Sequence, residues 1–309
     1  MPQTYVITGA TSFIGCRLVS HLLAEGHQVY AVCRDGQAAL RKLGTHEHLV
    51  LVEVQLQEYA CLAEKIHCGD VFVHLAWEGT NHSGRDAADV QQCNLRYSRQ
   101  ALDQAIRMGC QLFVEAGSQA EYGTQLQTIT EETPCQPFSE YGKAKLSVCQ
   151  HGFEVAETKA IKYMHLRIFS LYGEGDHPWT LVMTCVDKML KGEPVALSTC
   201  TQNWNFLYID DAVRQISRLC QYALLSNTFV HEIFNIASKD TRPLKEFVRS
   251  IWRLCDSKSE LRFGEVAPKN IVSLQPDVSK TERVVGTIDT VSFEQVVKTI
   301  INTRRENNL

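Results

Sequence analysis

Three side chains with complementary acid–base chemistry occur in two short stretches near the middle of the chain. Tyr141 and Lys145 stand in "SEYGKAK", four residues apart, so a helix places both on one face. Ser118 stands in "GSQAEYG", just after an apolar run of strand length. A tyrosine hydroxyl, a nearby ammonium and a serine hydroxyl can together exchange a proton with a sugar hydroxyl or carbonyl group.

The lysine matters because tyrosine is a poor base at neutral pH. Its reference pKa is ~10, so ionising it at pH 7 costs roughly 4 kcal/mol. An ammonium about 4 Å away, at an effective dielectric of about 20, could offset about that much. We therefore expect Tyr141, Lys145 and Ser118 to be catalytic. An isolated Tyr-x-x-x-Lys pair also occurs on ordinary helix surfaces, so the interpretation depends on a cofactor site nearby.

The stretch "TGATSFIG" at residues 8–15 has the pattern of such a site. It follows an apolar strand and precedes a helical pattern, which is the context of a dinucleotide-binding turn. Gly9 can form the tight turn and Gly15 can allow close helix packing, but Ser12 replaces the expected middle glycine. The helix N-terminus offers N–H groups and a favourable dipole to a pyrophosphate. The predicted cofactor-binding residues here are Gly9, Thr11, Ser12, Phe13 and Ile14.

The end of the second strand, "VYAVCRD", indicates which nicotinamide nucleotide is bound. NAD sites usually carry an acidic residue here for the ribose 2′-hydroxyl. Cys33 occupies that place, and the guanidinium of Arg34 after it matches a 2′-phosphate. We expect Arg34 to select NADP(H), with NAD(H) as the alternative cofactor. The competing interpretation is an exposed Arg34 paired with Asp35.

The first half of the chain alternates apolar runs with helical patterns. Strands are expected at 5–8, 28–33, 49–54, 71–76 and 112–116, and a long helix at 86–108. Near-continuous apolar strands separated by helices predict a parallel sheet covered on both faces. We therefore predict an α/β fold of the Rossmann type, with a doubly wound parallel sheet.

After about residue 173 the alternation becomes irregular, which predicts a smaller, interleaved substrate domain. Helices are expected at 180–191, 210–225, 244–254 and 293–305, and short strands at 195–198, 233–237 and 261–266. The predicted cofactor domain covers 1–173 with returning segments at about 205–237. The predicted substrate domain covers 174–204 and 238–309.

The composition excludes several classes of protein. The 309 residues are 44% hydrophobic and 21% charged with a net charge of −4, so a basic nucleic-acid surface is not expected. No apolar run reaches membrane-spanning length. The twelve cysteines form no C-x-x-C pair, so we interpret them as small buried hydrophobes and expect no metal. The first strand begins by Tyr5, so we expect no leader and a cytoplasmic protein.

Together the motifs resemble those of the extended short-chain dehydrogenase/reductase family, the nucleotide-sugar epimerases, dehydratases and reductases. The matching stretches, in the family's order, are "TGATSFIG", "HLAW", "GSQAEYG", "YGKAK", "RIFSLYG", "FLYIDDAV", "FNIASKD" and "PDVSKTERVVG". The resemblance implies a catalytic triad of Ser118, Tyr141 and Lys145, and a homodimer formed through two helices that include the one carrying Tyr141. It adds Leu75, Ala76, Asn94, Tyr141 and Lys145 to the cofactor-binding residues. For Asn94 the alternative is an ordinary helix-surface asparagine.

Departures from the family pattern narrow the reaction. Family dehydratases carry an acidic pair directly after the residue matching Ser118, whereas Gln119 and Ala120 stand here. Glu121 should point elsewhere on an extended segment. Hydride transfer therefore remains as the expected reaction. The predicted preference for NADP favours reduction of the 4-keto group of a nucleotide-activated deoxysugar. The alternatives are a nucleotide-sugar 4-epimerase with tightly bound NAD(P) and a non-catalytic NADP-binding sensor.

The substrate side departs further from the family. Relatives place an asparagine where Ser170 stands, and an arginine where "NWNFLYIDD" has Trp204. Losing that arginine removes a charge-assisted diphosphate contact of ~1.5–3 kcal/mol, which Lys269 or Arg262 could supply instead. The candidate substrate-binding residues are Trp77, Thr80, Gln119, Ser170, Trp204 and Lys269. Glu78 and Thr80 are possible ligands of a sugar hydroxyl, with ordinary loop roles as the alternative. A core role is the alternative for Trp204, and His74 is expected to be a core histidine.

Overall fold

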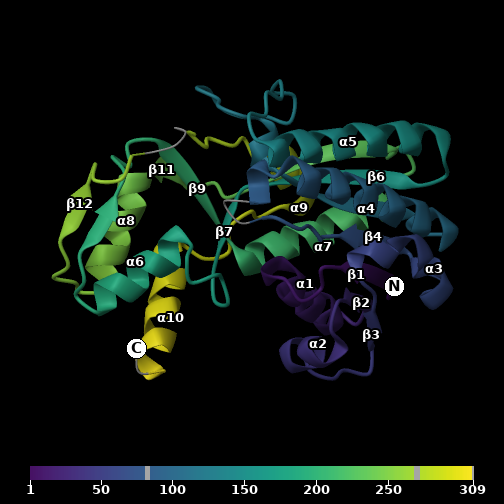
Figure 1. The fold of residues 1–309 in the computed structure, drawn as a ribbon, viewed down its shortest axis with the longest axis horizontal. Helices are drawn as coiled ribbons and strands as arrows, with labels where there is room; N and C mark the ends of the chain where they lie inside the picture. The colour runs from purple at the N-terminus through teal and green to yellow at the C-terminus, as the bar shows by residue number, and fades with distance from the viewer. Residues whose placement is uncertain (81–83, 268–271, 308–309) are drawn as a thin grey trace.

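The computed structural model describes residues 1–80, 84–267 and 272–307. Over these residues its main feature is a sheet of seven parallel strands in the order β10-β6-β5-β4-β1-β2-β3 (Figure 1). The strands are β1 (Thr4–Thr8), β2 (Gln28–Cys33), β3 (Leu49–Glu53), β4 (Val71–His74), β5 (Leu112–Ser118), β6 (Lys162–Ile168) and β10 (His231–Ile236). The predicted Rossmann-type parallel sheet is confirmed.

Helices cover both faces of this sheet, and the alternating side chains of β1 show why. Tyr5 and Ile7 enter the core under α1 and α7, whereas Val6 enters the core under α4 and α5. One face carries α1 (Phe13–Ala24), α7 (Ile209–Leu225) and α9 (Ser279–Val285). The other carries α4 (Ala88–Arg107), α5 (Glu140–Thr158), α3 (Leu62–Lys65) and the 3-10 turn η1 (Leu56–Cys61), while α2 (Gly36–Leu43) packs beside β3.

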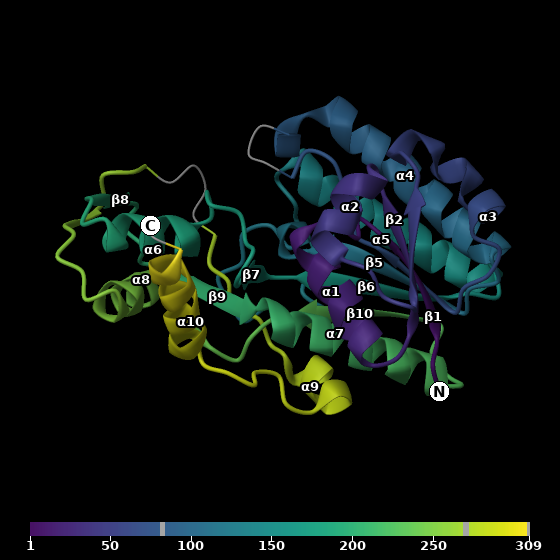
Figure 2. The ribbon, with the colours of Figure 1, turned by 90° about the horizontal axis from the view of Figure 1, so that it is seen from below.

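A smaller lobe lies beside the carboxyl ends of the large sheet (Figure 2). Its strands are β7 (Ser170–Tyr172), β9 (Asn203–Tyr208) and β11 (Thr241–Pro243) in one sheet, and β8 (Val195–Leu197) with β12 (Leu261–Phe263) in another. Its helices are α6 (Leu181–Leu190), α8 (Leu244–Leu254) and α10 (Phe293–Glu306). Phe206, Phe247 and Phe293 form the centre of its own hydrophobic core. The separate core supports the predicted domain boundary near residue 173, which stays a proposal.

Some strands end at residues other than those predicted, because a strand ends where its partner ends. The strand predicted at 71–76 stops at His74, opposite Thr8, the last residue of β1. The strand predicted at 112–116 continues to Ser118, because β6 pairs with it as far as Ile168. The strand predicted at 261–266 stops at Phe263, since β8 ends opposite it.

The cysteines only partly follow the interpretation from composition. All twelve are free thiols and seven of them are buried, but Cys61 and Cys68 are exposed. Cys61 ends η1 and Cys68 follows α3, and both lie outside the core that Tyr59 and Leu62 join there. Among the described residues no side-chain cluster suits a metal ion, and no helix has the length and apolar character needed to cross a membrane.

Gly152 marks the closest approach of α5 to the sheet and gives a prediction about stability. A Cβ at this position would lie 2.1 Å from Cζ of Tyr163, a ring that is 1% exposed and stacked on Phe113. We expect Gly152→Ala to lower the free energy of unfolding by about 1–3 kcal/mol, although alanine favours helix. Urea unfolding followed by circular dichroism measures the change. Gln150→Ala, exposed on the same helix, should stay within about 0.5 kcal/mol; a Gly152→Ala protein as stable as the wild type would contradict the prediction.

Candidate active site

The turn after β1 requires glycine at two positions. Gly9 has φ +66°, and a Cβ there would lie 2.8 Å from the backbone nitrogen of Ala76. A Cβ on Gly15 would lie 2.2 Å from the carbonyl oxygen of Gly9. Ser12 is the N-cap of α1, where its Oγ accepts a hydrogen bond of 3.0 Å from the Gly15 N–H. The serine that replaces the middle glycine therefore begins the helix.

This turn fits the pyrophosphate of a dinucleotide. It lies at the carboxyl ends of β1 and β4, where the strand order reverses. The first N–H groups of a helix have no acceptor within it, and the first turn of α1 holds no acidic residue. Lys42 of α2, which the sequence did not single out, donates a hydrogen bond of 3.0 Å to the Thr11 carbonyl. Phe13 and Ile14, in the first turn of α1, are half-buried.

The end of β2 places Arg34 beside this turn, since Val32 pairs with Thr8. Cys33 is buried, and Asp35 caps α2 by accepting a hydrogen bond of 2.9 Å from the Ala38 N–H. Arg34 is exposed, and within the described ranges its guanidinium forms no ion pair with Asp35. The exposure in the competing interpretation is therefore confirmed, whereas its pairing of Arg34 with Asp35 is wrong.

The structure brings Ser118, Tyr141 and Lys145 together. Ser118 ends β5, and the other two lie in the first turns of α5, which packs on that strand. Their exposed fractions are 6%, 8% and 3%. Burial raises the pKa of Tyr141, whereas the Arg85 guanidinium, 4.6 Å from the ring centroid, and a hydrogen bond with Ser118 lower it. Arg85 belongs to the 3-10 turn η2 (Gly84–Asp86). It is part of no recognisable sequence motif, so the sequence analysis did not identify it.

The Lys145 ammonium contacts strand β5 and the Trp77 ring. Its Nζ donates a hydrogen bond of 2.6 Å to the Ala116 carbonyl and lies 3.4 Å from the centroid of the Trp77 ring. The centroid of the Tyr141 ring is 6.0 Å away from this Nζ, so of these two cations Arg85 is the nearer to that ring. In this structure the largest effects that lower the pKa of Tyr141 come from Arg85 and from the hydrogen bond with Ser118.

Trp77 belongs to the same cluster as Tyr141 and Lys145. Its ring meets that of Tyr141 edge-on at 6.0 Å and 85°, and its Nε1 donates a hydrogen bond of 2.9 Å to Gln91. Asn94 of α4 fixes the following residue: its Oδ1 accepts from the Glu78 N–H at 3.0 Å and its Nδ2 donates to the Glu78 carbonyl at 2.9 Å. Asn94 is 2% exposed, so the helix-surface alternative is wrong.

Residues before Trp77 join the loop to the cofactor turn. Leu75 and Ala76 are half-buried, and both donate backbone hydrogen bonds to Thr8, at 3.2 and 3.4 Å. His74 lies between the Thr8 and Ser98 hydroxyls at 2.7 and 3.2 Å, and burial lowers its pKa to about 3. It is the neutral core histidine that the sequence predicted.

Glu121 lies on a 3-10 turn, η3 (Gln119–Glu121), where an extended segment was predicted. That prediction is wrong because Ser118 and Glu121 cap each other's backbone and close the turn. The Glu121 carboxylate is fully buried and accepts hydrogen bonds of 2.9 Å from both His165 and Arg167. Gln119 begins the turn and is half-buried.

The other candidate substrate residues are more dispersed. Ser170 is the half-buried first residue of β7, and Thr80 is exposed. Trp204 packs against both hydrophobic cores, which supports its core role, although no partner for its buried Nε1 is found among the described residues. Arg262 is paired at the surface with Glu260 at 2.9 Å. Lys269 lies outside the described residues.

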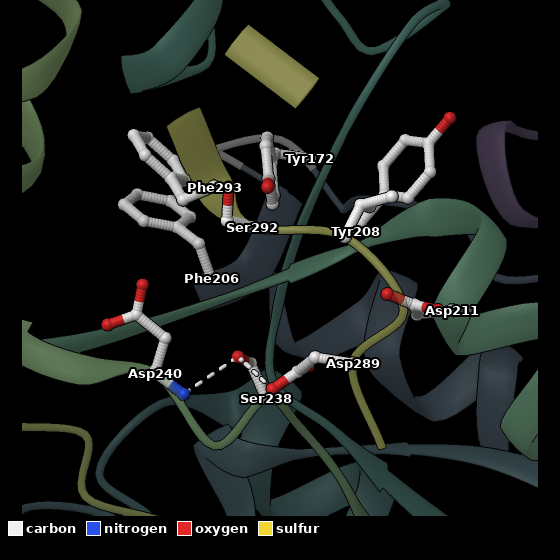
Figure 3. A pocket seen from close by; sticks show the side chains of 10 residues that line it. Tyr172, Phe206, Tyr208, Asp211, Ser238, Asp240, Asp289, Ser292 and Phe293 are labelled. Carbon is white, nitrogen blue, oxygen red and sulfur yellow. Dashed lines mark hydrogen bonds between the residues drawn. The ribbon is translucent and has the colours of Figure 1, made fainter. Parts of the chain in front are cut away.

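A cavity of about 120 Å³ lies where the two lobes meet (Figure 3). Carboxylates of Asp211, Asp240 and Asp289 line it together with the rings of Tyr172 and Phe206. Each acid already has a partner: Arg214 and Arg242 pair with the first two at 2.9 and 3.0 Å, and the Lys239 N–H donates to the third at 2.8 Å. Acidic walls repel a diphosphate, so we do not place a nucleotide there.

Comparisons with known proteins agree with this arrangement. The model of the NAD dependent epimerase/dehydratase family matches residues 5–237. A dTDP-6-deoxy-L-talose 4-dehydrogenase (NAD(+)) from Aggregatibacter actinomycetemcomitans is 28% identical over 221 residues, covering 68% of this chain and 77% of that protein. A CDP-abequose synthase from Salmonella muenchen is 22% identical, covering 86% of this chain and 85% of that protein.

The solved structures share the fold. A UDP-N-acetylglucosamine 4-epimerase from Methanobrevibacter ruminantium M1, solved with UDP-N-acetylmuramic acid, superposes with a TM-score of 0.87 at 19% identity and covers 99% of each chain. The chain belongs to the NAD dependent epimerase/dehydratase family, within the extended short-chain dehydrogenases/reductases.

Proposed function

We propose that the protein reduces the 4-keto group of a nucleotide-activated deoxysugar, with NADPH as the reductant. The observation that carries the proposal is the buried cluster of Ser118, Tyr141 and Lys145 at the carboxyl edge of a dinucleotide-binding sheet. Gln119 and Ala120 supply no acid–base pair after Ser118, and Glu121 is engaged by His165 and Arg167. This favours hydride transfer over dehydration.

The positive charge beside the glycine-rich turn supports NADP(H) over NAD(H). Arg34 is exposed next to the end of β1, and Lys42 contacts the turn itself. Both cations suit a 2′-phosphate. Of the nearby carboxylates, Asp35 is used as a helix cap and Glu53 of β3 accepts a hydrogen bond of 2.8 Å from the Gly36 N–H.

The residues of the cluster divide the chemistry of ketone reduction among them. The nicotinamide, when bound, supplies the hydride that forms the new C–H bond at the carbonyl carbon. Tyr141 donates the proton that completes the hydroxyl group, and the Ser118 hydroxyl donates a hydrogen bond to the same oxygen as negative charge develops there. Lys145 stabilises the Tyr141 phenolate that remains. One hydride and one proton convert the ketone to the alcohol.

A nucleotide-sugar 4-epimerase is the second candidate, because the same cluster can take a proton from the C4 hydroxyl and later return it. The similarity in fold to a 4-epimerase favours this alternative. Such an enzyme recycles its cofactor, so it consumes no NADPH. A non-catalytic sensor is disfavoured because Tyr141 and Lys145 are both present.

The Tyr141 hydroxyl gives the first prediction about activity. With NADPH and a panel of 4-keto-6-deoxy nucleotide sugars, the wild type should oxidise one NADPH per ketone reduced, measured at 340 nm. Tyr141→Phe should lower kcat by at least about 100-fold, because the proton donor is lost. Tyr222→Phe makes the same chemical change on a surface-exposed side chain of α7 and should leave kcat unchanged.

The outcomes separate the candidate functions. Unchanged turnover in Tyr141→Phe would refute the catalytic assignment. No NADPH oxidation by the wild type with any ketone, together with an isomerised sugar detected by NMR and a cofactor that copurifies, would establish the epimerase instead.

Arg34 gives a prediction about cofactor choice. Arg34→Ser should raise the Kd for NADPH about 10-fold or more, because a charge-assisted contact worth ~1.5–3 kcal/mol is lost, and should leave the Kd for NADH unchanged. Quenching of tryptophan fluorescence measures both constants. Arg41→Ser removes an exposed arginine on α2 and serves as the control. Equal losses for the two nucleotides in Arg34→Ser would refute the 2′-phosphate assignment.

A further inference from the structure

Glu115 is a buried acid that has no role in the proposed ketone reduction. It lies in β5, three residues before Ser118, and is fully buried. His74 and His165 stand at the paired positions of the two neighbouring strands. Both Glu115 carboxylate oxygens lack a hydrogen-bond partner among the residues the structure describes. A carboxylate in such a place is costly to keep unless a counter-charge stabilises it.

Lys145 supplies that counter-charge. Its Nζ lies 3.7 Å from Glu115 Oε1, and both side chains are nearly or fully buried. The other contacts of Nζ are the Ala116 carbonyl and the Trp77 ring. Burial lowers the pKa of Lys145 to about 8 although Glu115 raises it, and burial raises the pKa of Glu115 to about 7 although Lys145 lowers it. Each group therefore favours the charged form of the other, against the effect of burial.

The other charged groups near Lys145 do not compete with Glu115 for its ammonium group. Glu121 is the other carboxylate that acts on Lys145, but it is in contact with His165 and Arg167. Burial alone would lower the pKa of His165, yet Glu121 raises it to about 10, so this histidine is a cation.

Two neutral groups complete the surroundings of Glu115. His74 is uncharged, since burial lowers its pKa to about 3, and burial holds the pKa of the Tyr163 hydroxyl well above its usual range. Within the described part of the chain, Glu115 is the acid at ion-pair distance from Lys145.

We propose that Glu115 is a positioning residue: its carboxylate keeps Lys145 charged and holds Nζ within the cluster of Tyr141 and Trp77, so that Lys145 can stabilise the phenolate. This inference rests on the proposed role of the Tyr141–Lys145 pair. Direct electrostatics oppose it in part, because the Glu115 charge raises the pKa of Tyr141. The benefit of Glu115 must therefore pass through Lys145, which makes the titration of that lysine the decisive quantity.

The test uses the variant Glu115→Gln in the full-length chain. Glutamine removes the negative charge and keeps nearly the same side-chain shape. NMR of protein labelled at lysine Cε, with Lys145→Met to assign the signal, gives the pKa of Lys145 without any substrate. We expect it to fall by at least one pH unit, because the carboxylate that favours the cation is gone. With NADPH and the ketone, the charged lysine is then lost earlier as pH rises. The basic limb of the kcat profile should therefore move to lower pH by the same amount.

Two further variants separate positioning from packing. Glu115→Asp keeps the charge and should restore most of the Lys145 titration. Tyr163→Phe removes a buried hydroxyl on the neighbouring strand without changing any charge, and should leave that titration in place even if the unfolding midpoint falls. An unchanged Lys145 pKa in Glu115→Gln, or a higher kcat at every pH, would overturn the proposal. Because the NMR measurement needs no turnover, it remains decisive if the proposed reaction is wrong.

Discussion

The geometry of the candidate active site depends on the hydrogen bonds and ion pairs formed by the buried carboxylate of Glu121. It accepts a hydrogen bond of 2.7 Å from the Ser118 N–H and faces two cations, His165 and Arg167. Both neighbours come from β6, so the acid clamps the end of β5 to the next strand of the sheet. Removing one partner of a buried ion pair costs about 3–5 kcal/mol. The position of Ser118 is therefore fixed electrostatically, and the same charge is unavailable for chemistry on a substrate.

The network of buried contacts around Glu121 extends to β10, the strand at one edge of the large sheet. Arg167 donates a hydrogen bond of 3.2 Å to the Glu131 carbonyl and lies over the ring of Tyr122, at 4.4 Å from its centroid. The Tyr122 hydroxyl donates in turn to Asn235 of β10 at 2.7 Å. Buried charge is thus concentrated on β5 and β6, whereas β4 carries the neutral His74. The cofactor side of the site keeps its positive charges, Arg34 and Lys42, at the surface, where a phosphate can reach them.

The parts of this protein that the sequence predicts are those that depend on local patterns. The apolar runs predicted the strands because a parallel sheet buries both faces, and Gly9, Tyr141 and Lys145 were found because their spacing is fixed by a turn and a helix. Strand ends were less predictable, since they depend on the length of a partner strand.

Partners distant in sequence were not predictable at all. Arg85 meets Tyr141, and Glu115 meets Lys145, only because η2, α5 and β5 pack together. Within β5 a lone glutamate among apolar residues gave a signal that could have been noticed. Arg85, on a polar loop, gave none.

Polar contacts join α1, α7 and the end of β9 beside the cofactor turn. Arg17 of α1 forms a bidentate ion pair with Asp210 at the start of α7, at 2.7 and 2.9 Å, and the Tyr208 hydroxyl at the end of β9 donates to the same carboxylate at 2.8 Å. Such half-exposed pairs contribute only about 0.2–1 kcal/mol, so they add little to the stability of this junction. Trp204 and Tyr208 pack against both cores, so apolar contacts hold β9 to the large lobe as well as to the small one.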